Sequence, residues 1–254
     1  EGEENMTSLN PTKNSFNFQS SFSLNTAYFS KFNLQGAVSE YNHSERTGDG
    51  NNHNINFFSD LYEIKTSLNH KSIIDVNSEG LIGFHFQNYD QGALGQEESH
   101  LVHTRTSSFA LFALESFNFD LFDLDIGGRV ESVNLKNTSM EKGFFPGAFS
   151  STIKKEIFNN NSVFGGFDFT QRAPNAVELF ANGPHHAQEQ FEVGDSNMDV
   201  ETSYNFSLGY SYNNGLDTFK IETYYNYIDD FIAADRDGTT TCLLYTSPSP
   251  RDLV

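Results

Sequence analysis

The stretch that decides the fold is Val200-Glu-Thr-Ser-Tyr-Asn-Phe-Ser-Leu-Gly-Tyr-Ser-Tyr212. Aromatic, aliphatic and threonine residues occupy every second position, and polar or small residues occupy the positions between them. Because successive side chains of an extended chain point to opposite faces, this period of two predicts a β-strand with one apolar face. The same period recurs over residues 122–131 and 219–227. The sequence therefore predicts an all-β protein.

The strand-like segments are long and their connections alternate in length. We predict ten strands near residues 14–24, 29–43, 55–70, 78–90, 106–118, 121–133, 148–157, 162–171, 199–213 and 217–232. Short turns rich in Asn and Gly lie near 118–121, 159–161 and 213–215, and long loops lie near 44–54, 91–105, 134–147 and 172–198. Long strands joined alternately by tight turns and long loops are typical of outer-membrane β-barrels.

The composition excludes several classes of protein. The chain has 254 residues with a formal net charge of −19, and 15% of its residues are aromatic. Disordered chains are poor in aromatic residues, and phosphate binding needs a basic surface, so neither disorder nor a nucleic-acid partner is expected. We find no Gly-x-Ser-x-Gly elbow, phosphate-binding glycine loop or His-Glu-x-x-His motif, and we expect no enzyme.

Alternation alone fits either a soluble β-sandwich, whose aromatic face is buried, or a membrane barrel, whose aromatic face meets lipid. Strand length and loop asymmetry favour the barrel. A charge facing lipid costs about 2–4 kcal/mol at the bilayer midplane. We therefore expect the charged residues of these strands to face the lumen, namely Asp123, Asp125, Arg129, Glu201 and Lys220.

A second stretch, Phe169-Thr-Gln-Arg-Ala-Pro-Asn-Ala-Val-Glu-Leu-Phe-Ala-Asn-Gly-Pro-His185, carries a resemblance to a known family. It resembles the TonB-dependent receptors of Gram-negative outer membranes, and within them the subgroup that includes zinc-uptake receptors. The matching motif residues are Arg172, Ala173, Pro174, Glu178, Leu179, Gly183, Pro184, Glu192, Gly194, Asp195 and Glu201.

The resemblance implies that residues 1–241 are an incomplete antiparallel transmembrane β-barrel, about ten strands of a larger barrel that is plugged in this family. No plug-like segment is recognised, so we expect a fragment. The implied protein is a monomer in the cell outer membrane, in contact with its lipid. It takes up a scarce nutrient with energy from the TonB protein, through the missing plug. Two alternatives are a passive porin-like channel and a soluble β-sandwich module for binding or adhesion.

Histidines are the candidate ligand-binding residues, because neutral imidazole is the commonest metal ligand. Six of the eight lie in or beside the predicted long loops. The candidate metal ligands are His100, His103, His185, His186, Glu97 and Glu98. No resident cofactor is expected, and zinc or a ferric chelate such as an iron-siderophore complex would be the transported ligand. The alternative is that these are solvated loop histidines and that the Gly-Pro-His motif only shapes its loop.

The many carboxylates would concentrate cations at the mouth of a barrel, or would only keep its loops solvated. Arg172 is expected to be structural, paired with Asp168 or Glu178, and Pro174 is expected to end a strand because it lacks a backbone donor.

The last residues form an unusual segment. Cys242-Leu-Leu-Tyr-Thr-Ser-Pro-Ser-Pro-Arg-Asp252 resembles a translated sequencing adapter. We therefore expect residues 242–254 to be a non-native tail and leave them out of the fold prediction. Cys242 is the single cysteine, so no internal disulfide is possible.

Overall fold

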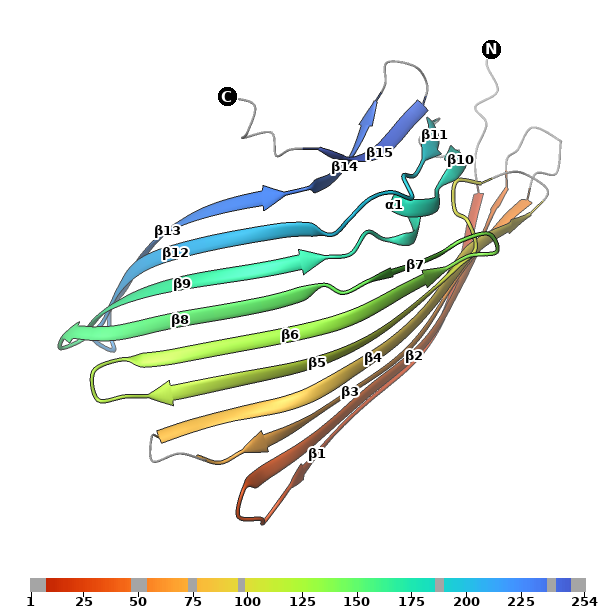
Figure 1. The fold of residues 1–254 in the computed structure, drawn as a ribbon. Coiled ribbons are helices and arrows are strands. Elements are labelled where there is room, and N and C mark those ends of the chain that lie inside the picture. The colour runs from red at the N-terminus through yellow and green to blue at the C-terminus, as the bar shows by residue number, and fades with distance from the viewer. Residues whose placement is uncertain are drawn as a thin grey trace.

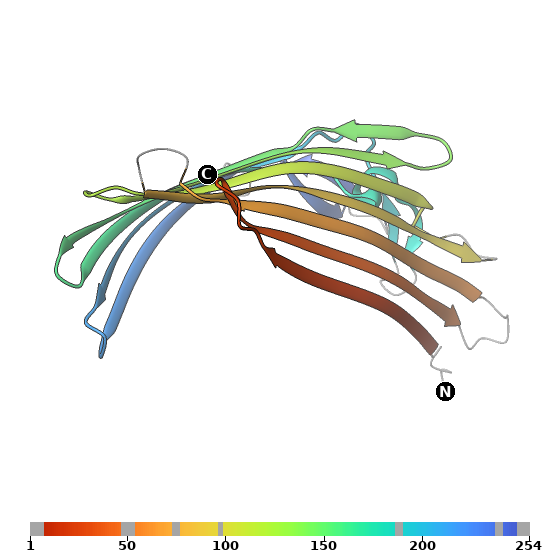
Figure 2. The ribbon, with the colours of Figure 1, turned by 90° about the horizontal axis from the view of Figure 1, so that it is seen from below.

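The computed structural model describes residues 8–46, 54–72, 77–95, 99–185, 190–236 and 241–247. Ten long strands form one curved antiparallel sheet (Figures 1 and 2). In sheet order they are β1 (Ser8–Ser23), β2 (Phe29–Arg46), β3 (Asn54–His70), β4 (Asn77–Gly95), β5 (Thr104–Asn118), β6 (Asp123–Lys136), β8 (Gly147–Phe158), β9 (Asn161–Arg172), β12 (Glu201–Asn213) and β13 (Thr218–Asp229). A short strand, β7 (Glu141–Phe144), pairs with β6. Each of the ten predicted strands corresponds to one of the long strands, which confirms an antiparallel all-β fold whose barrel is not closed.

The differences from the prediction lie in the connections. Strands β2 and β4 continue to Arg46 and Gly95, within segments that we predicted as loops. The predicted strand 217–232 is broken at Asp230, whose φ of 51° lies in the left-handed region. Asp is one of the few residues that adopt this conformation readily, because its side chain can hydrogen-bond locally. The chain therefore leaves the large sheet after β13. No helix in the described part of the chain is long and apolar enough to cross a bilayer.

The two faces of the large sheet differ in chemistry as the alternation predicts. Strand register places the five residues predicted to face the lumen on one side, which we call the polar face: Asp123, Asp125, Arg129, Glu201 and Lys220. On the opposite, apolar face Val130, Leu208 and Ile221 are 64%, 63% and 59% exposed. The side chains of Arg129 and Glu131 are only 30% and 21% exposed. A soluble sheet shows the reverse distribution, so this sheet presents its apolar face outward.

Several charged side chains on the polar face pair with a neighbouring side chain. Arg129 pairs with Glu131 at 2.9 Å and contacts His85 at 3.4 Å, while His85 hydrogen-bonds Glu63 at 2.8 Å. Phe112 lies on this face beneath the Lys65 ammonium, which is 5.1 Å from the ring centroid. Glu131, Arg129, His85 and Glu63 therefore form one connected polar network across β6, β4 and β3 on this face.

A smaller unit covers the polar face at the end of the sheet where the long connections lie (Figure 1). It contains helix α1 (Ala176–Phe180) and a four-stranded sheet of β10 (Asn182–His185), β11 (Gln190–Val193), β15 (Thr241–Ser247) and β14 (Phe231–Arg236). Its buried core consists of Leu135, Phe144, Ala176, Leu179, Phe180, Met198 and Ile232. The described parts of the segment 172–198, which we predicted as a loop, thus contain a helix and two short strands, and their core is shared with β6, β7 and β14.

Strand β15 includes Cys242 and pairs with β14 and β11. This pairing does not test whether residues 242–254 are native to the protein, and their assignment as a foreign tail stays a prediction.

Candidate metal centre

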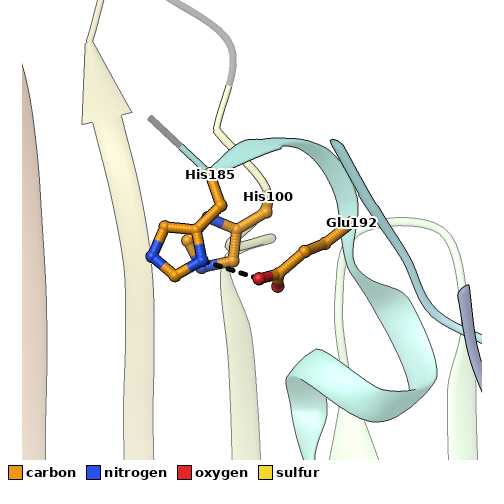
Figure 3. Close-up of side chains that lie close together, drawn as sticks. All are labelled: His100, His185 and Glu192. Atoms are coloured by element: carbon orange, nitrogen blue, oxygen red, sulfur yellow. Dashed lines mark hydrogen bonds and ion pairs between the residues drawn. The ribbon is translucent and has the colours of Figure 1, made fainter. Parts of the chain in front are cut away.

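Three potential metal ligands from two separate connections lie together beside the small sheet: His100, His185 and Glu192 (Figure 3). Each offers one ligand atom, and these atoms all lie within 4.8 Å of one another. The rings of His100 and His185 stack with their centroids 4.2 Å apart. A hydrogen bond of 2.6 Å joins His185 Nδ1 to Glu192 Oε1. Two imidazoles and one carboxylate are a donor set that Zn²⁺ uses in proteins, with one coordination position left open.

Backbone pairing brings these side chains together. Strands β10 and β11 form a hairpin in which Gly183 lies opposite Glu192. His100 runs beside β10, donating its backbone N–H to Pro184 O at 3.2 Å and accepting from the N–H of Asn182 at 3.4 Å. This close approach needs a glycine, because a Cβ on Gly183 would lie 2.4 Å from Ser99 O. Gly183 and Pro184 therefore shape the loop, and His185 is carried into the cluster by the same hairpin.

Burial favours the neutral form of the His100 imidazole. All three side chains are partly buried, and burial lowers the pKa of His100, as does the neighbouring His185. The nearby carboxylate of Glu192 acts in the opposite direction. The Nδ1 atom of His100 is buried without a hydrogen-bond partner among the described residues. A neutral imidazole with a free ring nitrogen is the form that binds a metal.

The structure separates His103 from His100. His103 Nε2 contacts Asp90 Oδ1 at 2.7 Å, and Arg105 pairs with the same carboxylate at 2.8 Å. Asp90 and Arg105 are opposite each other in strand register, in line with the apolar face of the sheet rather than the polar one. The remaining predicted ligands, Glu97, Glu98 and His186, lie outside the described residues.

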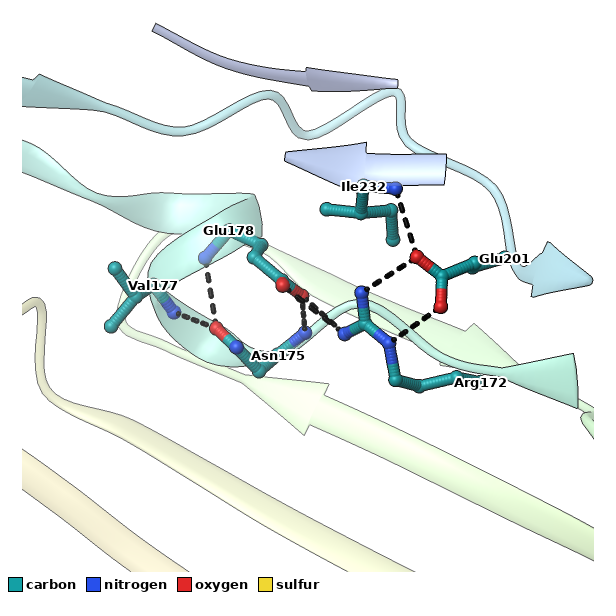
Figure 4. A network of polar contacts seen from close by, with 6 residues as sticks. All are labelled: Arg172, Asn175, Val177, Glu178, Glu201 and Ile232. Atoms are coloured by element: carbon teal, nitrogen blue, oxygen red, sulfur yellow. Dashed lines mark hydrogen bonds and ion pairs between the residues drawn. The ribbon is translucent and has the colours of Figure 1, made fainter. Parts of the chain in front are cut away.

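Arg172 fixes the start of the segment that carries the hairpin (Figure 4). Its guanidinium bonds both oxygens of Glu178, at 3.1 and 2.9 Å, and both oxygens of Glu201, at 3.3 Å each. Glu201 also accepts the backbone N–H of Ile232 at 2.9 Å. The expected Glu178 pair is present, and Arg172 in addition ties β9 to the first residue of β12.

Other motif residues build helix α1 and attach it to the hairpin. Asn175 and Glu178 form a capping box, in which each side chain accepts from the other's backbone N–H. Leu179 is 1% exposed, Pro174 is fully buried, and Ala173 packs against the same core. The N–H of Gly194 donates to Ala181 O at 2.7 Å, and that of Asp195 donates to Glu178 O at 2.9 Å. A Cβ on Gly194 would lie 2.7 Å from Leu179 C, so this residue must also be small.

The sequence did not indicate that His100 and His185 meet, since the two lie in different connections and no local pattern links them. The Arg172–Glu201 pair was also missed, although both residues belong to the family motif. The sequence does contain a signal for α1: Glu178 follows Asn175 by three residues, which is the spacing of a capping box at the start of a helix.

Comparison with known families decides the assignment. Residues 2–250 match the family described as "TonB dependent receptor-like, beta-barrel". The chain belongs to this family. A TonB-dependent receptor barrel is a receptor and not an enzyme, and the soluble sandwich alternative is set aside. This match is to the family as a whole, and it does not assign the chain to the zinc-uptake subgroup.

Solved structures show the same fold at low sequence identity. The copper transporter OprC superposes with a TM-score of 0.76 at 13% identity, covering 92% of this chain and 41% of its own. The TM-score is 0.81, at 11% identity, for a double mutant of the hemophore receptor HasR of Serratia marcescens in complex with its hemophore HasA and heme. That match covers 94% of this chain and 44% of the receptor chain. The iron transporter FrpB of Neisseria meningitidis superposes with a TM-score of 0.71 at 12% identity, covering 93% of this chain and 39% of its own. The chain thus spans less than half the length of each of these three proteins.

Proposed function

We propose that this chain forms part of the wall and mouth of an outer-membrane receptor that captures a transition-metal cation, with zinc as the preferred ligand. The observation that carries the proposal is the cluster of His100, His185 and Glu192 at the end of the barrel with the long connections. Its support is the family assignment together with similar folds in a copper transporter and an iron transporter.

The donor set favours a bare cation over a chelate. Imidazole nitrogen and carboxylate oxygen suit Zn²⁺ and other divalent transition metals. The ligand atoms lie within 4.8 Å of one another, which leaves room for one ion between them but not for a bulky organic chelator. The net charge of −19 further attracts cations and repels anionic ferric complexes.

The outward apolar face supports placement in the outer membrane. Its exposed aliphatic and aromatic residues suit contact with lipid, whereas the paired charges of the polar face suit a lumen. Capture at the mouth would then be followed by uptake through a plug supplied by the rest of the receptor and coupled to the TonB protein.

Zinc titration calorimetry of the complete receptor in detergent tests the capture site. His100→Ala, His185→Ala and Glu192→Gln should each weaken zinc binding about tenfold or more, because each removes a ligand. His103→Ala is the matched control and should bind as the wild type does, because His103 contacts Asp90 instead. Equal affinity in all variants would reject the site. Zinc uptake that persists in cells lacking TonB would instead identify a passive channel.

A further inference from the structure

We propose that a groove in the apolar face of the large sheet binds one membrane phospholipid, with an acyl chain over Gly128 and the headgroup ammonium at Glu115. The inference goes beyond metal capture, and it rests on the proposed placement of this face in lipid. The groove has a volume of about 770 Å³ and is lined by residues of β2, β3, β4, β5, β6 and β8. That volume falls within the range of about 300–1,000 Å³ in which proteins hold small molecules.

Two small residues make the floor of the groove. Ala113 and Gly128 lie opposite each other in the register of β5 and β6. An added Cβ on Gly128 would meet nothing within 4 Å, so the groove exists here because the position carries no side chain. The exposed side chains of Ile82, Leu111 and Val130 stand around this floor. A glycine inside a strand weakens that strand and often marks a place where a ligand approaches closely.

A paired histidine and carboxylate lie at one end of the groove. His70, Gly80 and Glu115 form one row of the sheet, and Glu115 follows Ala113 on the apolar face of β5. His70 Nε2 lies 2.7 Å from Glu115 Oε2, and His70 Nδ1 lies 2.9 Å from Lys71 O. The two side chains meet above Gly80, where an added Cβ would lie 2.7 Å from His70 Nε2 and closer still to Glu115 Oε2. The glycine therefore makes room for the pair.

The position of this pair along the strand suits a lipid headgroup. Glu115 lies near the end of β5 at Asn118, about 10 Å of extended strand from the edge of the sheet that carries the short turns. A charge on the lipid side costs least near such an edge, where headgroups and water replace the acyl chains. The groove beside Ala113 then lies on the acyl-chain side of the pair.

Charge complementarity selects the headgroup. The His70 side chain is only 8% exposed, whereas that of Glu115 is 28% exposed, so the carboxylate is the group that a lipid can reach. His70 occupies Glu115 Oε2, and Glu115 Oε1 has no hydrogen-bond partner among the described residues. A carboxylate oxygen at the end of an apolar groove attracts an ammonium and repels a headgroup of net negative charge. Phosphatidylethanolamine combines such an ammonium with acyl chains.

Native mass spectrometry tests the site on the complete receptor in detergent, titrated with phosphatidylethanolamine or with phosphatidylglycerol of the same acyl chains. The wild type should bind the ethanolamine lipid about tenfold more tightly. Glu115→Gln should remove this preference, and Gly128→Leu should weaken binding of both lipids about tenfold, because its side chain fills the groove. The control is Gly165→Leu on the same face outside the groove, where an added Cβ comes no closer than 3.7 Å to another strand.

Each outcome decides the question. Equal affinity of the wild type for the two lipids, or wild-type binding in Gly128→Leu, would overturn the proposal. Equal weakening in Gly165→Leu would show that lipid coats the whole face without a site, and would overturn it too. Thermal unfolding in detergent confirms that the barrel is intact, and Gly128→Leu leaves the pair of His70 and Glu115 in place. A receptor that stays folded in water without detergent would instead reject the placement of this face in lipid.

Discussion

Replacement of Gly183 by alanine should disconnect the two halves of the metal site without disturbing the barrel. An added Cβ would lie 2.4 Å from Ser99 O and 2.8 Å from the backbone N of His100. Ordinary van der Waals contact begins at 3.4 Å, so the 99–100 backbone must retreat by about 1 Å. The present hydrogen bond from His100 N to Pro184 O is 3.2 Å and would not survive such a shift.

Metal coordination tolerates far less displacement than this. Ligand distances in metal sites hold to within about 0.2 Å, so His100 would drop out of the coordination sphere. We expect zinc affinity to fall about ten- to a hundredfold in titration calorimetry of the complete receptor. The matched control is Gly143→Ala in strand β7, where an added Cβ meets nothing within 4 Å. Unchanged zinc affinity in Gly183→Ala would refute the argument that the close approach at Gly183 builds the site.

Three further predictions follow from the fold and the charges. Arg172→Ala should destabilise the segment 173–200 by about 1–3 kcal/mol, because it leaves the partly buried carboxylates of Glu178 and Glu201 without their ion-pair partner. Hydrogen exchange measures this, and unchanged protection of the backbone amides in this segment would contradict it. Phe206→Arg should block membrane insertion at a cost of about 2–4 kcal/mol, whereas Ser207→Arg on the polar face should insert. Assembly of Phe206→Arg with failure of Ser207→Arg would show the facing to be inverted. Because burial and His185 lower the pKa of His100, protons compete with zinc for it less than for a free histidine. The His100 imidazole should therefore stay neutral at a lower pH than a free histidine does; titration of its NMR signal checks this, and protonation at a higher pH than that of free histidine would contradict it.

The strands could be predicted because their signal is local. Alternation alone indicates that Tyr204, Phe206 and Leu208 lie on one face of their strand. The strand register places their partners in β9 and β13 on the same face of the sheet. The break at Asp230 escaped prediction, because the residues on both sides keep the strand pattern and only the backbone angle changes.

The candidate site was predictable only in its parts. Histidine and carboxylate content identified His100 and His185 separately, each with acidic neighbours in its own connection. Their meeting depends on the backbone contact between the 99–100 segment and β10, and a contact between distant segments leaves no periodic trace in the sequence. The same holds for Glu201, whose pairing with Arg172 follows from β9 and β12 being neighbours in the sheet.

The most direct test of a metal-capturing mouth is anomalous X-ray scattering at the zinc edge, from crystals of the complete receptor grown with zinc. We expect a peak bounded by His100, His185 and Glu192. A peak at His103 and Asp90 instead, or no peak at this end of the barrel, would contradict it.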